Sequence, residues 1–246
     1  MSKILAFTNQ KGGVGKTTST ANIGAGLLRA GKRVLLVDLD PQANLSKGLG
    51  VVKAEKNVYG ALLQEYPLKA YPAHGMGLIA GSPALSGFEK VKGDELDREF
   101  LLKELLEPIR GKFDYILLDC PPALGLVTLN AYACAQELYI PLEAQLYATD
   151  GLEMVLGLVS RVQRRLNPEL IVGGIFFTRH DARKVLRRET AEQMRAQHPE
   201  LVLNSFIRES IALGEAPHLG KDIFTYAPQS AGATDYQALV AEILTR

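Results

Sequence analysis

The sequence predicts an α/β protein, a single-domain, doubly wound and mostly parallel sheet flanked by helices. Short apolar runs alternate along the chain with segments whose apolar residues recur at helical spacing, which is the pattern of parallel sheets. A glycine-rich loop joins the first run to the first helical segment, and two later runs end in aspartate. The runs expected to form strands are residues 4–7, 34–37, 77–81, 115–118, 137–142, 170–177 and 201–207.

The predicted helices follow from apolar residues three and four positions apart, which share one face of a helix. A chain of 246 residues has the size of one large α/β domain, and we expect that domain to cover residues 1–246. The helical segments are residues 18–30, 58–64, 95–109 and 234–244, with further helices after the strands at 137–142 and 170–177.

The composition is that of an ordinary globular protein, with 47% hydrophobic and 22% charged residues. The two cysteines, Cys120 and Cys134, form no C-x-x-C pair, which argues against a disulfide scaffold or a zinc site. The chain enters a strand almost at once, which leaves no room for a signal peptide, and no apolar run approaches the ~20 residues that span a bilayer. We therefore expect a cytoplasmic protein.

The loop after the first strand has the composition of a phosphate-binding loop. Positions 11–18 have the sequence KGGVGKTT, whose glycines allow backbone angles that turn successive N–H groups toward phosphate oxygens. The following helix adds its positive N-terminal end. Lys16 supplies a charge for the β- and γ-phosphates, and Thr17 supplies a hydroxyl for Mg²⁺. Gln10 occupies the position of the first glycine in the usual loop pattern, and a second lysine, Lys11, opens the loop.

This segment resembles the deviant Walker A loop of the ParA/MinD family of ATPases, a branch of the P-loop NTPases. The resemblance implies that Lys11, the signature lysine, reaches the nucleotide of a second subunit, so that ATP closes a homodimer. It also implies ATP and Mg²⁺ as cofactors, and catalytic roles for Lys11 and Lys16. The residues that it assigns to nucleotide binding are Lys11, Gly12, Gly13, Val14, Gly15, Lys16, Thr17 and Thr18.

Three aspartates follow predicted strands, at the carboxyl edge where open α/β sheets bind ligands. Asp38 and Asp40 follow the second strand, and Asp119 follows the run at 115–118. Taken alone, each aspartate could cap the turn after its strand. The segments Asp-Leu-Asp-Pro-Gln and Asp-Cys-Pro-Pro also resemble two further motifs of the family. By that resemblance Asp40 holds the attacking water, and the residues on the magnesium side of the site are Thr17, Asp38 and Asp119.

Residues 151–195 include nine basic and five acidic residues, a local net charge of +4 in a chain whose net charge is +1. On a helix, Arg183 and Arg187 are four residues apart and share a face, as do Lys184 and Arg188. Such a stripe indicates an anionic partner, with nucleic acid the natural candidate, although a solvated helix surface has the same pattern. The resemblance favours DNA, bound without regard to sequence through these four side chains.

One segment departs from the family pattern. Soj-type members often carry Ile-Pro-Arg-Asn-x-Arg-Leu-x-Glu-Ala-Pro, whereas residues 207–217 have Glu209 and Ala212 in place of the two arginines and Arg208 in place of the proline. DNA contacts therefore cannot be transferred from that segment. The adenine contacts stay open, with Arg208 as a candidate nucleotide contact.

The motifs occur in family order and predict a partition ATPase of the short ParA/Soj type, without the N-terminal helix-turn-helix domain of some relatives. We expect an ATP-bound dimer on non-specific DNA in the nucleoid, released when a ParB-like partner stimulates slow hydrolysis.

The alternatives are a ParA-like ATPase that positions another cargo, a MinD-like membrane-cycling ATPase, a metal-cluster ATPase related to the nitrogenase iron protein, and a binding module without turnover. The segment 234–244 has almost no cations, which disfavours membrane binding, and the two unpaired cysteines disfavour a metal cluster.

Overall fold

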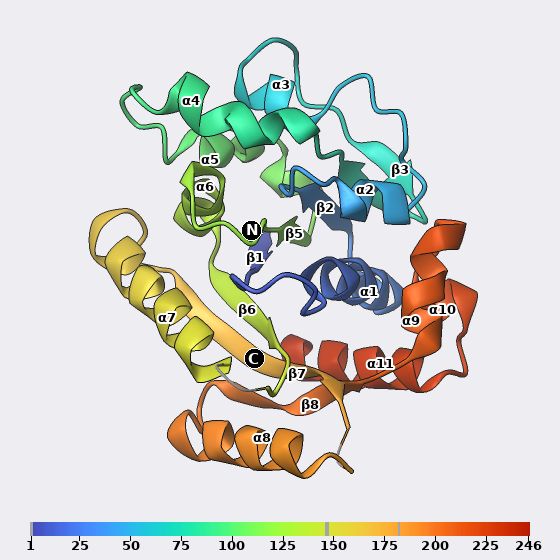
Figure 1. The fold of residues 1–246 in the computed structure, drawn as a ribbon. Helices are drawn as coiled ribbons and strands as arrows, with labels where there is room; N and C mark the ends of the chain where they lie inside the picture. The colour runs from blue at the N-terminus through green and yellow to red at the C-terminus, as the bar shows by residue number, and fades with distance from the viewer. Residues whose placement is uncertain (1, 146–147, 182) are drawn as a thin grey trace.

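Eight strands form one sheet within residues 2–145, 148–181 and 183–246, the part of the chain that the computed structural model describes (Figure 1). Their order across the sheet is β3-β4-β2-β5-β1-β6-β7-β8, and neighbours are parallel except for the antiparallel pair β3–β4. The predicted fold class is confirmed. The strands are β1 (Lys3–Phe7), β2 (Val34–Asp38), β3 (Tyr71–Ala73), β4 (Met76–Ile79), β5 (Tyr115–Asp119), β6 (Glu137–Leu142), β7 (Ile171–His180) and β8 (Val202–Arg208).

Helices connect most of these strands. The α-helices are α1 (Lys16–Arg29), α2 (Asn44–Gly48), α3 (Val58–Leu62), α4 (Phe88–Lys92), α5 (Leu101–Leu106), α6 (Leu126–Cys134), α7 (Ala148–Arg165), α8 (Val185–Gln197), α9 (Ile211–Glu215), α10 (Ile223–Tyr226) and α11 (Ala231–Leu244). Three short 3₁₀ helices among the described residues are η1 (Pro83–Gly87), η2 (Glu107–Lys112) and η3 (Ala216–Leu219).

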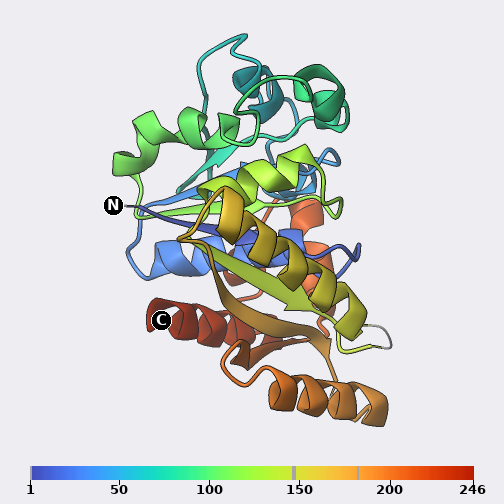
Figure 2. The ribbon, with the colours of Figure 1, turned by 90° about the vertical axis from the view of Figure 1, so that its left-hand side faces the viewer.

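The sheet is buried on both faces because alternate residues of its central strands point to opposite sides. In β1, Ile4 and Ala6 belong to one apolar core, and Leu5 and Phe7 belong to the other. Helices α5, α6, α7 and α8 cover the first core, and α1, α10 and α11 cover the second (Figures 1 and 2). Burial on both faces explains why the strands are continuous apolar runs in the sequence.

The carboxyl ends of β1, β2 and β5 lie side by side. Asp119 at the end of β5 is in register with Phe7 of β1 on one side and with Asp38 of β2 on the other. Strand β2, which follows β1 in the chain, lies on one side of β1, with β5 between them. Strand β6, which follows β5 in the chain, lies on the other side of β1. The loop after β1 therefore lies where the strand order reverses, which is where open α/β sheets bind ligands.

Three local predictions differ from the structure. The sequence did not predict β3, which is a three-residue edge strand with proline at its centre. The predicted helix at 95–109 is wrong in its first part, because Asp97 has a left-handed backbone (φ 56°) and α5 begins only at Leu101. Helix α8 begins at Val185, so Arg183 and Lys184 precede it. Among the helices in the described ranges, none has the length and apolar character needed to cross a membrane.

Candidate nucleotide-binding site

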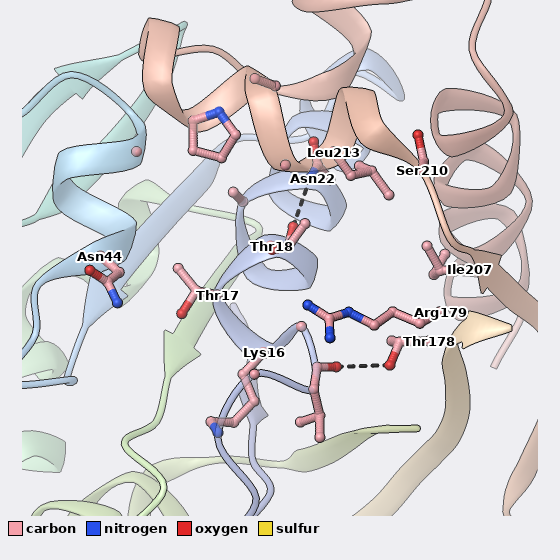
Figure 3. Close-up of a pocket in the computed structure, with 18 of the residues that line it drawn as sticks. Lys16, Thr17, Thr18, Asn22, Asn44, Thr178, Arg179, Ile207, Ser210 and Leu213 are labelled. Atoms are coloured by element: carbon pink, nitrogen blue, oxygen red, sulfur yellow. Dashed lines mark hydrogen bonds between the residues drawn. The ribbon is translucent and has the colours of Figure 1, made fainter. Parts of the chain in front are cut away.

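A cleft of about 760 Å³ opens at the carboxyl edge of the sheet, beside the glycine-rich loop (Figure 3). This volume lies within the range of about 300–1,000 Å³ that is usual for small-molecule sites. Segments from across the chain line the cleft, including residues 12–18, Asp40, Gln42, Thr178, Arg179, residues 207–211 and Pro217.

The loop backbone is shaped to receive an anion. Gly13 and Gly15 have φ values of 76° and 86°, in the left-handed region that favours glycine. No atom lies within 4 Å of the place where a Cβ on Gly12 or Gly13 would be, apart from their chain neighbours. Helix α1 begins at Lys16, and no side chain caps its first turn. The free N–H groups of that turn fit a phosphate group.

Lys16 brings a positive charge into the protein beneath this loop. The residue is only 7% exposed, and its Nζ donates to the carbonyl oxygen of Lys11 at 3.2 Å. Burial lowers the pKa of the Lys16 amine, while the nearby carboxylate of Asp119 opposes that shift. A buried ammonium is stabilised by an anionic ligand, because burying an unpaired charge is costly.

Thr17 and Asp119 are in direct contact. The Thr17 Oγ1 donates to Asp119 Oδ2 at 2.7 Å, and the Thr20 hydroxyl lies 3.4 Å from the other carboxylate oxygen. Asp119 is fully buried, and this burial, together with the neighbouring Asp38, raises its pKa well above the usual value. A cation beside this carboxylate would restore its charge. A hydroxyl and a carboxylate are also the oxygen ligands that Mg²⁺ prefers, so the residues present fit this ion.

The two aspartates after β2 have different surroundings. Asp38 accepts hydrogen bonds from the Ser46 backbone N at 2.8 Å and from the Ser46 Oγ at 2.6 Å, and burial raises its pKa to about 6. Asp40 lines the cleft, where its Oδ1 also accepts a hydrogen bond from the Gln42 backbone N at 2.9 Å. The structure thus brings Asp40 to the cleft and turns Asp38 toward the start of α2.

Lys11 is exposed at the start of the loop. Its Nζ donates to the side chain of Gln145 at 2.5 Å, and its backbone N donates to Asn9 Oδ1 at 3.0 Å. Asn9 in turn donates to the carbonyl oxygen of Pro141 at 2.8 Å, so the start of the loop is tied to the end of β6.

Two residues at the end of β7 join the site without having been predicted. The Thr178 hydroxyl donates to the carbonyl oxygen of Val14 in the loop at 2.9 Å. Arg179 has a left-handed backbone (φ 48°), and its side chain extends into the cleft over the start of α1 (Figure 3). The signal that could have found them is their position, because polar residues that end an apolar strand lie at the ligand-binding edge.

Arg208 also lines the cleft, at the end of β8. Its guanidinium is bound to a carboxylate of the same chain, because Nη2 and Nε donate to Asp235 at 2.6 and 3.0 Å. The structure therefore brings Arg208 to the predicted place but also gives it a strong internal partner.

The four basic residues assigned to one helical stripe do not share a face. Arg183 and Lys184 precede α8, and the side chain of Arg187 is only 16% exposed, so this geometric prediction is wrong. Each residue has an acidic neighbour, which compensates the expected repulsion. The pairs are Arg183–Asp181 at 2.9 Å, Lys184–Glu209 at 3.8 Å, Arg187–Glu143 at 2.7 Å and Arg188–Glu192 at 3.9 Å.

Fold and site together define a P-loop nucleotide-binding protein. A family model described as "AAA domain" matches residues 2–172. The chain is 45% identical to the chromosome-partitioning ATPase Soj of Treponema pallidum, over 100% of this chain and 98% of that protein. It is 41% identical to the sporulation initiation inhibitor protein Soj of Bacillus subtilis, over 99% and 98% of the two chains. The chain belongs to the ParA/Soj family of partition ATPases.

A solved structure has a similar fold and contains related ligands. The chain is similar to the crystal structure of cobyrinic acid a,c-diamide synthase from Mycobacterium smegmatis with bound ATP analog and magnesium. The TM-score is 0.89 at 34% sequence identity, and the match covers 99% of this chain and 94% of the other. The ligands of that protein agree with the predicted cofactors, ATP and Mg²⁺.

Proposed function

We propose that this chain is an ATP- and Mg²⁺-dependent partition ATPase that dimerises with ATP and then binds DNA without regard to sequence. The observation that carries the proposal is the buried ammonium of Lys16, which lies at the start of an uncapped helix. Among the described residues it has a carbonyl partner and no carboxylate in ion-pair contact. The phosphates of a nucleotide are the natural counter-charge for such a group.

The residues around Lys16 have separate roles in hydrolysis. Bound ATP and Mg²⁺ supply the phosphoanhydride bond and the cationic charge that stabilises its cleavage. Thr17 and Asp119 would hold the metal, and Lys16 would hold the β- and γ-phosphate oxygens. Asp40 lies in the cleft, where its carboxylate accepts a hydrogen bond from the attacking water and orients it.

The dimer depends on Lys11 in this proposal. Its side chain is exposed, and its contact with the half-buried Gln145 is one exposed hydrogen bond. Such a bond contributes little net stability, so Lys11 can exchange Gln145 for the phosphates of a partner subunit. ATP then joins two copies, and hydrolysis removes the γ-phosphate that joined them.

DNA binding is assigned to the exposed basic residues around the start of α8, namely Arg183, Lys184 and Arg188. The ion pairs of Lys184 and Arg188 are exposed at both partners and therefore weak, so DNA phosphates can compete for them. Arg183 forms a bidentate pair with Asp181, but its own side chain is 90% exposed and can also face DNA. A dimer doubles the number of such contacts, which makes DNA binding depend on ATP. A protein of this kind resides on the nucleoid, and a ParB-like partner accelerates its hydrolysis.

The last described helix supports DNA over a membrane as the partner. Helix α11 contains no lysine or arginine and buries Tyr236, Leu239, Val240 and Ile243. An interfacial membrane helix needs cations beside an exposed apolar face. Sedimentation with anionic liposomes tests the MinD-like alternative, because the proposal predicts that the ATP-bound protein stays in the supernatant.

The experiment that tests the proposal measures molar mass by light scattering and DNA binding by anisotropy, with ATP, ADP and no nucleotide. The wild type should dimerise and bind DNA only with ATP. Lys11→Ala should bind ATP, stay monomeric and lose DNA binding. A Lys11→Ala protein that still dimerises with ATP would contradict the mechanism. Phosphate release with and without DNA distinguishes an ATPase from a binding module, and a pull-down identifies a different cargo.

A further inference from the structure

Arg187 joins the ends of two neighbouring strands. Its Nη2 donates to Glu143 Oε1 at 2.7 Å, and its Nη1 donates to the backbone oxygen of Arg179. Glu143 directly follows β6, and Arg179 is the penultimate residue of β7. A guanidinium presents several donors in a rigid plane, so one side chain can hold both strand ends at once.

The β6 end that Arg187 holds is also the end that positions the signature lysine. Asn9, which accepts the Lys11 backbone N–H, donates to Pro141 in β6. Gln145, which accepts from Lys11 Nζ, lies two residues after Glu143. A shift of this strand end would therefore move both anchors of Lys11.

The β7 end contacts the other half of the phosphate loop. Thr178 donates to the Val14 carbonyl oxygen at 2.9 Å, and the next residue, Arg179, extends its side chain into the cleft (Figure 3). The left-handed backbone of Arg179 is a conformation that surrounding contacts must maintain. The hydrogen bond from Arg187 to its carbonyl oxygen is one such contact.

The same contacts leave Arg187 much less exposed than the basic residues assigned to DNA binding. Its side chain is 16% exposed and Glu143 is 6% exposed, whereas the side chain of Arg183 is 90% exposed. Separating a buried arginine from its carboxylate leaves a charge without a partner, so DNA phosphates compete poorly for it.

We propose that Arg187 is a positioning residue of the nucleotide site and not a DNA contact. It holds the ends of β6 and β7 against the phosphate loop, and thereby sets the geometry of Lys11 and Arg179. This inference rests on the proposed function, because it assumes that the cleft binds ATP.

Two variants separate this role from DNA contact. If Glu143 merely sequesters a DNA-binding arginine, Glu143→Gln releases Arg187, strengthens DNA binding and leaves nucleotide affinity unchanged. If the pair positions the nucleotide site, Glu143→Gln and Arg187→Met both weaken nucleotide affinity. We expect a loss of about ten- to hundredfold, the range found for residues that orient the ligands of metal ions. Arg187→Lys should recover only part of it, because an ammonium cannot span both acceptors.

The affinities are measured by titration calorimetry of the full chain with Mg²⁺ and a non-hydrolysable ATP analogue, and DNA anisotropy is measured at saturating analogue. Arg161→Ala, which removes an exposed arginine of α7, is the matched control and should change neither affinity. The double variant Glu143→Gln/Arg187→Met leaves no unpaired buried charge, so it reports on positioning if a single variant fails to fold.

The possible results are distinct. If the wild type does not bind the analogue, the proposed function fails. If it binds, and the folded Arg187 and Glu143 variants bind equally well, the positioning role is overturned. Weaker analogue binding in these variants, without the stronger DNA binding that a released arginine would give, supports it.

Discussion

Thr17 Oγ1 donates a hydrogen bond to Asp119 Oδ2 at 2.7 Å, which joins the first turn of α1 to the end of β5. This contact brings together a hydroxyl from the phosphate loop and a carboxylate from a strand that lies 102 positions later in the chain. Both groups present oxygen atoms of the kind that Mg²⁺ prefers, and Thr17 lines the same cleft as Lys16.

Replacing Asp119 with asparagine tests whether this pair holds Mg²⁺. The charged carboxylate is lost, so ATP should bind about ten- to hundredfold more weakly in the presence of Mg²⁺, with little change in EDTA. Calorimetric titrations with Mg²⁺ and with EDTA measure the difference. Because burial already disfavours the charged form of Asp119, the neutral variant should remain folded. An unchanged response to Mg²⁺ would exclude Asp119 as a metal ligand.

Arg179 should contribute to nucleotide affinity through its side chain. We expect Arg179→Ala to weaken ATP binding by about tenfold, the value of a lost hydrogen bond to a charged group. Arg179→Gly should bind ATP as weakly but unfold at a higher temperature than Arg179→Ala, because glycine adopts the φ of 48° without strain. Equal ATP affinity in the wild type and both variants would show that the side chain does not contact the ligand.

The proposed DNA surface predicts a change in salt dependence. Arg188→Ala should weaken binding of random-sequence DNA and lower the slope of log affinity against log salt concentration by about one. Glu192→Gln removes the acidic neighbour of Arg188 and should strengthen binding slightly. Anisotropy titrations at several salt concentrations, with saturating ATP analogue, give both slopes. Equal slopes of log affinity against log salt concentration for the wild type and Arg188→Ala would mean that Arg188 makes no phosphate contact.

The surroundings of Glu242, a residue outside the nucleotide site, predict that the stability of the fold depends on pH. Burial alone would raise the pKa of this carboxylate, but hydrogen bonds from Ser205 and Asn204 of β8 lower it below its ordinary 4.5. Since the pKa is lower in the folded state, the stabilisation exists above pH 4.5 and is lost as pH falls below it.

The free energy of unfolding of the wild type, relative to Glu242→Gln, should therefore decrease as the solution is acidified from pH 6 to about 3. Denaturant unfolding at a series of pH values measures this difference. A difference that does not vary with pH would show that the hydrogen bonds do not favour the charged form.

The phosphate loop could be predicted because its chemistry is contained in consecutive residues. Glycines at 12, 13 and 15 specify the backbone, and Lys16 and Thr17 follow at the positions that the next helix requires. The fold class followed from the alternation of apolar runs and helical segments, since burial on both faces leaves a direct pattern in the sequence. Neither inference requires knowing which distant segments meet.

Only the tertiary structure decided which side chains that are distant in the sequence come into contact. Asp38 and Asp40 are two residues apart and equivalent by pattern, but Ser46 binds the first and the cleft receives the second. Arg187 was indistinguishable from Arg188 in the sequence, yet it turns inward because Glu143, 44 positions earlier, provides a buried carboxylate. Such pairings arise from strand order and packing, and local sequence periodicity does not predict them.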